Sequence, residues 1–394
     1  MHVLISALHR ASKPTGICRY AVNLAECLAA APEITKVTLI VGFWQREYFT
    51  TAFNLCFSKI DIIGVDIKNS SLSRNIWFLF GLPKLAHQLS PDLVHLSFPL
   101  PFARPLFPCP VISTIHDLYP YELPENFGKI QASFNRLFLK QCVEQSDALT
   151  CVSQTTLDRL QFFFPMLRAE QESTVIYNVV DFKEAQPEVP KFFKGQENIP
   201  FLLSVAQHRK NKNLNLLIYS YGFLLRMKKI DPTTKLILVG SQGPETENLL
   251  KQIKQLKLED NVYLLSSIND QELSWLYQQC QLFIMPSSVE GFCLPLAEAM
   301  HLSCKVVCSN IPIFREIGSA ECMYFSLQDN PIGNLAQAIT IVMTKPLIVD
   351  KSVKFSRLNI TSQYLQFYSS IMQNVNEDSF KLGVSNYQEP AKTM

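Results

Sequence analysis

The sequence predicts an α/β protein with two domains, each built on a parallel β-sheet covered by helices. Short β-branched or apolar runs alternate with amphipathic segments, which is the pattern of parallel α/β domains. The length of 394 residues suggests two or three domains at about 100–200 residues each. A stretch rich in Pro, Glu and Lys, residues 183–200, lacks periodicity and separates two series of strand candidates, so we interpret it as a linker.

The first series of strand candidates predicts a Rossmann-like domain over residues 1–182. Its members are short apolar runs: Val3–Ala7, Val37–Val41, Leu93–Ser97, Val111–His116, Ala148–Val152 and Thr174–Tyr177. Between the first two runs, apolar residues from Ile17 to Leu28 recur with helical spacing, so a helix is expected there.

The second series predicts another Rossmann-like domain over residues 201–353. Its strand candidates are Phe201–Val205, Leu236–Val239, Val262–Leu265, Leu282–Met285 and Val306–Cys308. A helix over 354–375 could pack back on the N-terminal domain, and residues 376–394 are expected to form a flexible tail. We expect the domains to face a central cleft, with ligands at the carboxyl ends of the strands.

The composition excludes several classes of protein. Hydrophobic residues make up 47% and charged residues 18%, which suits a large buried core and excludes a disordered chain. The net charge of +2 gives no field that would recruit nucleic acid. Glycine is scarce. The chain has 13 glycines, about 3.3% of its residues, whereas the usual frequency of ~7% would give roughly 28.

The chain is expected to be cytoplasmic. Its N-terminus has neither the basic region nor the apolar stretch of a signal peptide, and no run reaches the ~18 apolar residues of a spanning helix. The eleven cysteines form no CxxC pair, so we interpret them as small buried hydrophobes rather than as disulfides or metal ligands.

The strongest candidate site is the segment 286–300, which follows the strand candidate Leu282–Met285. A helix should begin near Leu294, and the N–H groups of Phe292, Cys293 and Leu294 would then form an anion site at its N-terminus. Glu290 precedes this terminus and Glu298 lies about one turn inside it. Two carboxylates flanking a phosphate site suit a nucleotide sugar; the alternative is a capping acid and a solvated helix residue.

A second candidate site is the basic cluster Gln207–Leu214, which follows the strand candidate Phe201–Val205. Cations between a strand and a helix can clamp a diphosphate and neutralise a leaving group, for which Lys212 and then Arg209 are the best candidates. The alternative is a solvated basic loop. In the first domain, His116 ends a strand candidate, although a lone histidine is more often structural than catalytic.

Segment 286–300 resembles the donor-site motif of family-4 retaining glycosyltransferases, which use nucleotide sugars and have the GT-B fold of two Rossmann-like domains. That motif has a Pro-Ser run, Glu-Gly-Phe-Gly, Leu-Pro and Glu-Ala-Met, and Glu290 and Glu298 have its spacing of seven intervening residues. Residues 273–277 resemble the helix before the motif strand, and 306–317 the strand and loop after it. The similarity covers nearly the whole chain.

The resemblance implies roles for the donor-site residues. Glu290 would hydrogen-bond sugar hydroxyls and Glu298 the ribose hydroxyls. The turn from Gly291 to Leu294 would offer N–H groups to the phosphates. Lys212-Asn213 matches the family, whereas Ala206-Gln207 stands where Gly-Arg is common, so Arg209 would supply the missing guanidinium.

In the N-terminal domain, the resemblance implies acceptor binding and two further site residues. The family has His-Asp at the end of this strand, which would bring His116 close to the donor sugar, with Asp117 orienting the loop. Thr15-Gly16 resembles the family's glycine loop, and Gly16 would permit close approach of phosphate and acceptor to the backbone.

The predicted function is retaining transfer of a mannose-like hexose from a nucleotide diphosphate sugar to an acceptor hydroxyl in polysaccharide or glycolipid assembly. The catalytic candidates are His116, Glu290, Lys212 and Arg209. No Asp-x-Asp cluster accompanies the motif, so neither a metal nor another cofactor is implied. The alternative is a nucleotide-sugar binding or assembly protein with little turnover. A dehydrogenase is a weaker rival because no GxGxxG follows the first strand of either domain.

The predicted acceptor is a glycan or a lipid-linked glycan. Residues 127–145 combine aromatic and aliphatic residues with Lys and Arg, which fits a helix on anionic lipid and leaves peripheral contact with the inner membrane face open. The sequence favours the alternative, a core-packed helix with a basic outer face.

Comparison with the family motif shows where glycines are missing. Six residues stand where the family usually has glycine: Thr15, Val179, Ala206, Ser266, Cys293 and Ser303. We therefore expect a donor pocket that is narrower and less pliable than in typical relatives.

Overall fold

The computed structural model forms two compact units. It describes residues 1–12, 15–51, 53, 55, 58–165, 167, 171–180, 186–318, 320–344 and 353–384. The first unit comprises residues 1–152, 156–179 and 357–394, and the second comprises 153–155 and 180–356. In the described part of the chain, no helix is both long and apolar enough to cross a membrane.

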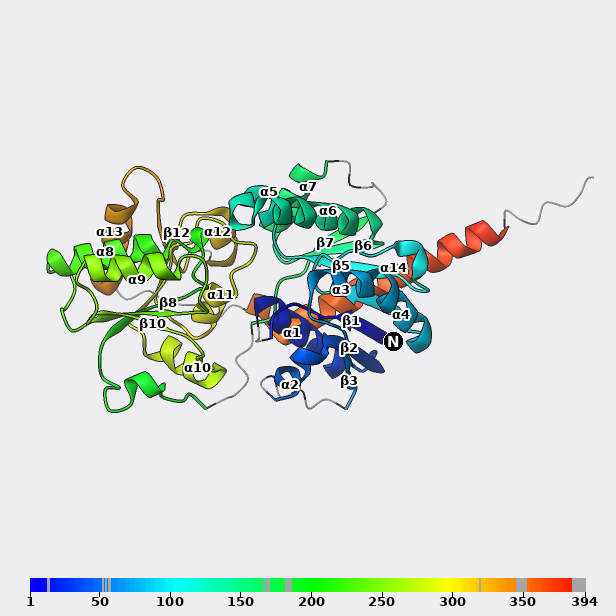
Figure 1. Ribbon diagram of the computed structural model, residues 1–394, viewed down its shortest axis with the longest axis horizontal. Helices are drawn as coiled ribbons and strands as arrows, with labels where there is room; N and C mark the ends of the chain where they lie inside the picture. The colour runs from blue at the N-terminus through cyan, green and yellow to red at the C-terminus, as the bar shows by residue number, and fades with distance from the viewer. Residues whose placement is uncertain are drawn as a thin grey trace, which may run out of the picture. The chain divides into compact units, whose positions relative to one another are not determined.

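The first unit is a seven-stranded parallel sheet with helices on both faces (Figure 1). Its strands are β1 (His2–Ser6), β2 (Lys36–Gly42), β3 (Ile60–Val65), β4 (Leu93–Leu96), β5 (Val111–Ile115), β6 (Ala148–Cys151) and β7 (Glu172–Val175). Its helices include α1 (Gly16–Ala30), α2 (Phe43–Thr51), α3 (Ser71–Ile76), α4 (Leu82–Leu89), α5 (Tyr119–Glu122), α6 (Lys129–Gln145), α7 (Gln154–Phe163) and α14 (Arg357–Val384). Alternate residues of β1 enter opposite cores: Val3 packs with α1, whereas Leu4 packs with α4.

The second unit is a six-stranded parallel sheet. Its strands are β8 (Phe201–Val205), β9 (Lys235–Val239), β10 (Val262–Leu265), β11 (Leu282–Met285), β12 (Val306–Ser309) and β13 (Met323–Phe325). Its helices include α8 (Leu214–Arg226), α9 (Thr246–Gln255), α10 (Asp270–Gln279), α11 (Leu294–His301), α12 (Pro312–Gly318) and α13 (Pro331–Thr344). Leu217 of α8 and Ile339 of α13 pack on Leu202 of β8 in its main core.

Both sheets have the strand order of a Rossmann fold, which confirms the predicted fold class. The first sheet runs β3-β2-β1-β4-β5-β6-β7 and the second β10-β9-β8-β11-β12-β13. In each sheet the order reverses once, between β1 and β4 and between β8 and β11. Ligands of such sheets bind at the carboxyl ends of the strands next to this switch point.

The sequence analysis did not predict two of the strands, β3 and β13. β3 contains Asp61 and Gly64, and as an edge strand it is half-exposed, so it lacks a continuous apolar run. β13 has three residues and is the other sheet's edge. The remaining strands agree with the predicted runs to within two residues at each end.

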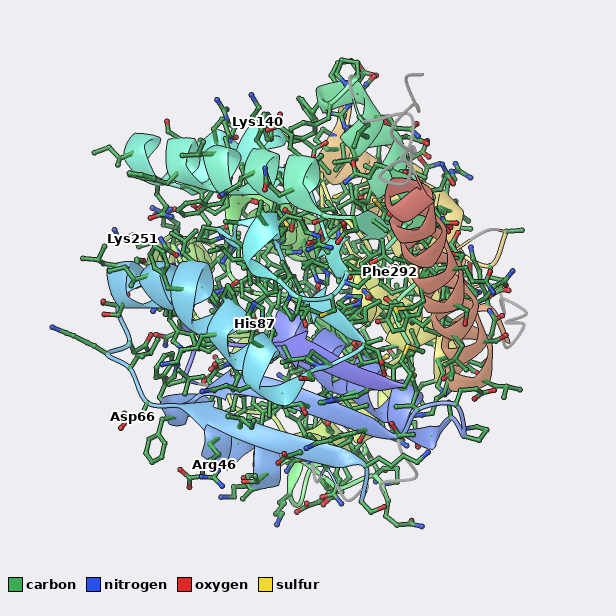
Figure 2. All side chains as sticks on the ribbon, turned by 90° about the vertical axis from the view of Figure 1, so that its right-hand side faces the viewer. Arg46, Asp66, His87, Lys140, Lys251 and Phe292 are labelled. Carbon is green, nitrogen blue, oxygen red and sulfur yellow. The ribbon has the colours of Figure 1, made fainter. Side chains whose placement is uncertain are left out.

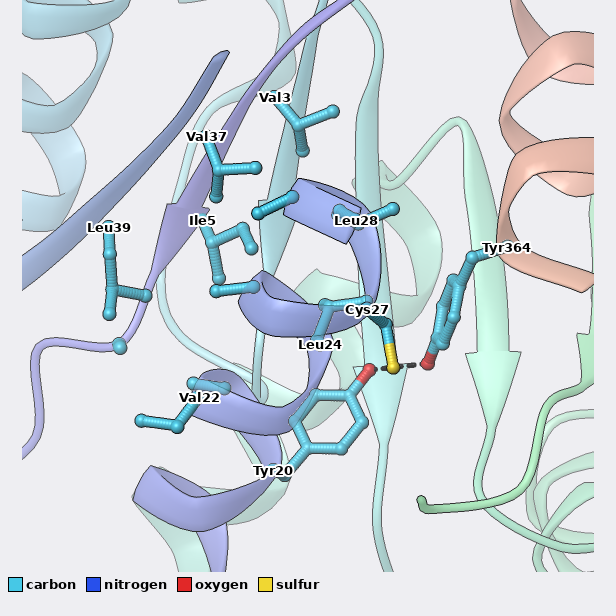
Figure 3. Close-up of a cluster of buried hydrophobic side chains, with 14 of the residues drawn as sticks. Val3, Ile5, Tyr20, Val22, Leu24, Cys27, Leu28, Val37, Leu39 and Tyr364 are labelled. Atoms are coloured by element: carbon cyan, nitrogen blue, oxygen red, sulfur yellow. Dashed lines mark hydrogen bonds between the residues drawn. The ribbon is translucent and has the colours of Figure 1, made fainter. Parts of the chain in front are cut away.

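The long helix α14 packs against α1 in the first unit. Its buried face contributes Ile360, Tyr364 and Tyr368 to the core beneath α1. The Tyr364 hydroxyl lies 2.7 Å from that of Tyr20, beside Cys27 of α1 (Figure 3). Near the start of α14, Arg357 pairs at 3.1 Å with Glu26, a fully buried acid of α1.

The stretch 183–200, expected as a linker, packs on the second unit over its described part, 186–200. Phe193 is buried there, with its ring 4.9 Å from that of Phe201 and 5.2 Å from that of Trp275. This aromatic anchor lies within an otherwise polar stretch, which explains why composition alone suggested a linker. Residues 183–185 lie outside the described residues, as does the end of the predicted tail, 385–394.

Candidate active site

The two predicted clusters of the second unit meet at its switch point. β8 and β11 are parallel neighbours, so the loops that follow them leave the same edge of the sheet. Asn211 Nδ2 donates to the Val289 carbonyl at 3.1 Å, and Ser288 N donates to the Asn211 carbonyl at 2.8 Å. Asn213 Nδ2 also donates to the Pro286 carbonyl at 3.0 Å. These three hydrogen bonds fasten one loop to the other.

Lys212 and Glu290 form an ion pair across the two loops. Lys212 Nζ lies 2.5 Å from Glu290 Oε1, and their side chains are 18% and 5% exposed. Because water screens this pair little, the attraction is stronger than at the surface, but each charge needs the other to offset its desolvation. The structure thus brings together the leading candidate of each cluster.

Arg209 and His208 flank this pair in the same loop. The partly exposed Arg209 guanidinium has no hydrogen bond or ion pair with a described residue. His208 is buried, which lowers its pKa, and its Nδ1 lies 2.9 Å from Thr246 Oγ1. Thr246 Oγ1 also accepts from Gly243 N at 2.9 Å. The other ring nitrogen of His208, Nε2, has no hydrogen-bond partner among the described residues.

The N-terminus of α11 lies next to the Glu290 loop. The helix begins at Leu294, as predicted, and no side chain caps it. The N–H groups of Cys293 and Leu294 have no acceptor in the described part of the chain, which leaves them available to an anion. The Phe292 side chain (labelled in Figure 2) is buried, its ring 5.4 Å from that of Phe355. The Phe292 side chain therefore packs inside the unit and does not serve a ligand.

Glu298 is held by Tyr277, which sequence reasoning did not identify. The Tyr277 hydroxyl donates to Glu298 Oε2 at 2.9 Å. Burial, and then the charge of Glu298, raise the pKa of Tyr277 well above its ordinary value, so the hydroxyl remains a donor. Glu298 is thus a positioned carboxylate rather than a solvated helix residue.

The scarcity of glycine has a measurable consequence in the backbone. Cys293 has φ = 71° and Ser303 has φ = 61°, so two of the six aligned positions adopt the left-handed conformation that favours glycine. Thr15 has φ = −127°, and its hydroxyl caps α1 by accepting from Cys18 N. Eight described non-glycine residues have positive φ: Ser90, Asn213, Lys228, Lys257, Ser267, Cys293, Ser303 and Asp329.

His116 lies at the carboxyl end of β5 in the first unit. Its Nε2 lies 2.7 Å from the Ser97 carbonyl, so Nε2 carries the proton and Nδ1 is the acceptor. Burial lowers its pKa to about 4, and the ring is therefore neutral at pH 7. Asp117 Oδ1 accepts from Tyr119 N at 3.1 Å, which orients the loop.

Gly16 starts α1 at the carboxyl edge of the first sheet, next to the switch point. A Cβ added there would meet nothing within 4 Å, so packing does not require glycine and the backbone faces open space. Three basic residues near this edge escaped prediction: His9, Arg10 and Arg74. The strand-end rule could have found the first two, whereas Arg74 follows the unpredicted β3.

Helix α6 differs from the interpretation that the sequence favoured. Leu139 and Cys142 pack inward, but Ile130, Phe134 and Leu137 are 76%, 49% and 57% exposed. The outer face is therefore apolar as well as basic, since Lys140 is also exposed.

Two family models together match residues 14–357 of the chain. The sequence model described as "Glycosyltransferase Family 4" matches residues 14–184, and that described as "Glycosyl transferases group 1" matches 185–357. The chain is 25% identical to the O-antigen chain mannosyltransferase RfbU of Salmonella typhimurium, over 80% of this chain and 84% of the relative.

Solved structures show the same fold. Anabaena HepE in complex with UDP and glucose matches with a TM-score of 0.64 at 18% identity, over 97% of this chain and all of that one. WaaG, a glycosyltransferase involved in lipopolysaccharide biosynthesis, matches with a TM-score of 0.66 at 15% identity, over 95% and 98% of the chains. The family models, the relative and the fold agree: the chain belongs to glycosyltransferase family 4 and is a glycosyltransferase of the GT-B fold.

Proposed function

We propose that the protein transfers a hexose from a nucleotide diphosphate sugar to an acceptor hydroxyl, with retention of anomeric configuration. The observation that carries this proposal is the Lys212–Glu290 pair at the second switch point, next to the open N–H groups of α11. This edge offers a cation and N–H donors for a diphosphate, and carboxylates for hydroxyl groups. A sugar nucleotide presents both kinds of group.

In the proposed mechanism, binding of the donor separates the Lys212–Glu290 ion pair. The diphosphate takes Lys212 as its counter-ion, with Arg209 as a second cation, and Glu290 turns to the sugar hydroxyls. Glu298, held by Tyr277, accepts from the ribose hydroxyls. As the bond from the anomeric carbon to the diphosphate breaks, the acceptor oxygen attacks from the same face and its proton passes to the leaving diphosphate oxygen. The two cations stabilise the charge that develops there.

In the first unit, His116 and Gly16 are assigned to the sugar and the acceptor. A neutral imidazole with its proton on Nε2 can accept a hydrogen bond from a sugar hydroxyl at Nδ1 without repelling an oxocarbenium-like centre. Gly16 leaves room for a phosphate or an acceptor close to the backbone.

The name of RfbU describes a mannosyltransferase, and the HepE structure contains UDP and glucose. We therefore propose a hexose donor, with mannose first, for polysaccharide assembly. Thermal shift with UDP-, GDP- and ADP-sugars would select the base, and NMR of the product would give the anomeric configuration. An inverted product, or full transfer by Glu290→Ala, would refute the assignment.

We propose that the reaction uses no metal, because Lys212 and Arg209 supply the positive charge at the leaving group. Transfer should therefore keep at least about half its rate in excess EDTA. A loss of more than tenfold, restored by Mg²⁺ or Mn²⁺, would refute the metal-free reaction while leaving the donor site in place.

The alternative function is a nucleotide-sugar binding or assembly protein with little turnover. The left-handed backbone at Cys293 favours it, because strain at the phosphate turn could misplace the N–H groups. Binding of a sugar nucleotide without release of the nucleoside diphosphate, in the presence of acceptor, would support this alternative.

We also propose that α6 contacts an anionic membrane surface. Its exposed Ile130, Phe134 and Leu137 lie on the same helix as exposed Lys140. Phe134→Ser/Leu137→Ser should reduce pelleting with phosphatidylglycerol vesicles several-fold. Phe43→Ser, which removes a 61% exposed aromatic residue from α2, is the matched control. Equal pelleting of all three proteins would refute the contact.

A further inference from the structure

A cluster of basic side chains lies at the carboxyl edge of the first sheet, outside the proposed donor site. Arg10 belongs to the loop after β1, and Arg74 to α3, which follows β3. Asn69 joins the two segments, because its Nδ2 donates to the Arg10 carbonyl at 3.1 Å and its Oδ1 accepts from Arg74 at 2.5 Å. Arg74 also donates to Ser71 Oγ at 3.3 Å. A single asparagine thus fixes the backbone of one arginine and the guanidinium of the other.

The cluster contains no compensating acid. Neither guanidinium forms an ion pair with a described residue, and Asp66, exposed in the loop after β3, pairs with neither. Burial, and then the charge of Arg10, lower the pKa of Arg74. Burial followed by the charges of both arginines lowers the pKa of His9 to about 4. The three side chains therefore lie within electrostatic reach of one another, and the repulsion between the two guanidinium groups would be relieved by an anion.

The position of the cluster is one where this fold binds ligands. The His9 ring packs edge-on against Phe98, which follows β4, with 5.5 Å between the centroids. Because β1 and β4 flank the switch point of the first sheet, His9 lies where the loops that follow these two strands meet. The same loop leads to α1, whose first turn carries no acid and whose Gly16 faces open space. That helix N-terminus adds a favourable dipole for an anion.

We propose that His9, Arg10 and Arg74 bind a phosphate or diphosphate group carried by the acceptor. This inference rests on the proposed function, since it specifies the acceptor class of that reaction. Guanidinium groups bind phosphate oxygens in bidentate fashion, and the Asn69 bridge holds one of them in place before the ligand arrives. A neutral glycan would leave this repulsion unrelieved, whereas a sugar linked through a diphosphate would neutralise it.

The test compares two soluble probes on the full chain: N-acetylglucosamine linked to an undecyl group through a diphosphate, and the undecyl glycoside without phosphate. Calorimetry at 150 mM salt should give at least tenfold tighter binding of the diphosphate probe. Arg10→Gln/Arg74→Gln should lose that tenfold and leave the glycoside unaffected. Arg10→Lys/Arg74→Lys, which keeps the charge, should lose less. Arg46→Gln/Arg226→Gln removes the same charge from exposed sites on α2 (Arg46 is labelled in Figure 2) and α8, and should match wild type.

Equal affinity of wild type and Arg10→Gln/Arg74→Gln for the diphosphate probe would overturn the inference, given unchanged near-ultraviolet circular dichroism. It would also be overturned if that variant lost pelleting with phosphatidylglycerol vesicles but kept its probe affinity, because the cations would then serve a lipid headgroup. UDP and GDP binding is measured alongside. If Arg10→Gln/Arg74→Gln keeps nucleotide binding but loses binding of the diphosphate probe, the inference is supported. Absence of sugar transfer by a wild type that still binds the probe through these arginines would refute the proposed function instead.

Discussion

The carboxyl edges of the two sheets have the same topology but opposite electrostatic designs. In the second unit, Lys212 and Glu290 neutralise each other at 2.5 Å. In the first, Arg10 and Arg74 have no acidic partner in the described part of the chain, and His116 is neutral. A paired edge selects a ligand that can replace both partners, such as a phosphate joined to hydroxyl groups. At an edge whose cations have no acidic partner, the binding of any anion is electrostatically favourable.

The largest expected difference between the two units is that acid destabilises the first more than the second. His9 and His116 have pKa values of about 4, and His95, buried in the first unit, about 3, all lowered mainly by burial. The unfolded chain binds these protons near pH 6.5, so it takes up more protons than the folded chain between pH 6.5 and 4. The free energy of unfolding of the first unit therefore falls as the pH falls through this window, by about 1.4 kcal/mol per unit of pKa difference.

Tryptophan fluorescence can follow each unit separately. Trp44 and Trp77 report on the first unit and Trp275 on the second, and these are all three tryptophans of the chain. In Trp275→Phe the transition should occur at a pH above that seen in Trp44→Phe/Trp77→Phe. Coincident transitions, or earlier unfolding of the second unit, would contradict the prediction.

Removal of one partner of the ion pair should have the next largest effect. Lys212→Ala would leave Glu290, 5% exposed, without a counter-ion, which costs about 3–5 kcal/mol in buried pairs. Sugar transfer should fall by about 10²–10³, as when one electrostatic stabiliser is lost. Denaturant unfolding and initial rates measure the two effects. Lys210→Ala removes an exposed lysine of the same loop and should change both little. If Lys212→Ala and Lys210→Ala had the same stability and the same rate of sugar transfer, the Lys212–Glu290 pair would contribute to neither.

The smallest expected effect concerns the two left-handed residues at the ends of α11. Cys293→Gly and Ser303→Gly should each relieve about 1–2 kcal/mol of backbone strain, partly offset by the larger entropy of an unfolded glycine. Net stabilisation should thus be below about 1 kcal/mol in both. Only Cys293→Gly should change donor affinity, because it alters the phosphate turn. Parallel thermal unfolding and nucleotide titration would check this, and an equal change in affinity for Ser303→Gly would contradict it.

Local sequence patterns predicted most of this fold, because buried parallel strands are continuous apolar runs. Such patterns could not identify β3, whose half-exposed edge position tolerates Asp61 and Gly64. The motif spacing and the strand-end rule placed Glu290 and Lys212 in loops that meet, but their pairing depends on β8 and β11 being neighbours. The cluster of Arg10 and Arg74 was missed for the same reason: it requires the placement of β3.

The most direct test of the account is hydrogen–deuterium exchange of the full chain with saturating UDP or GDP. Whichever nucleotide binds should protect amides in 206–213 and 286–298, the two loops tied together by Asn211. Saturated binding with unchanged exchange in both segments would show that the donor binds elsewhere and would contradict the assignment of the second switch point.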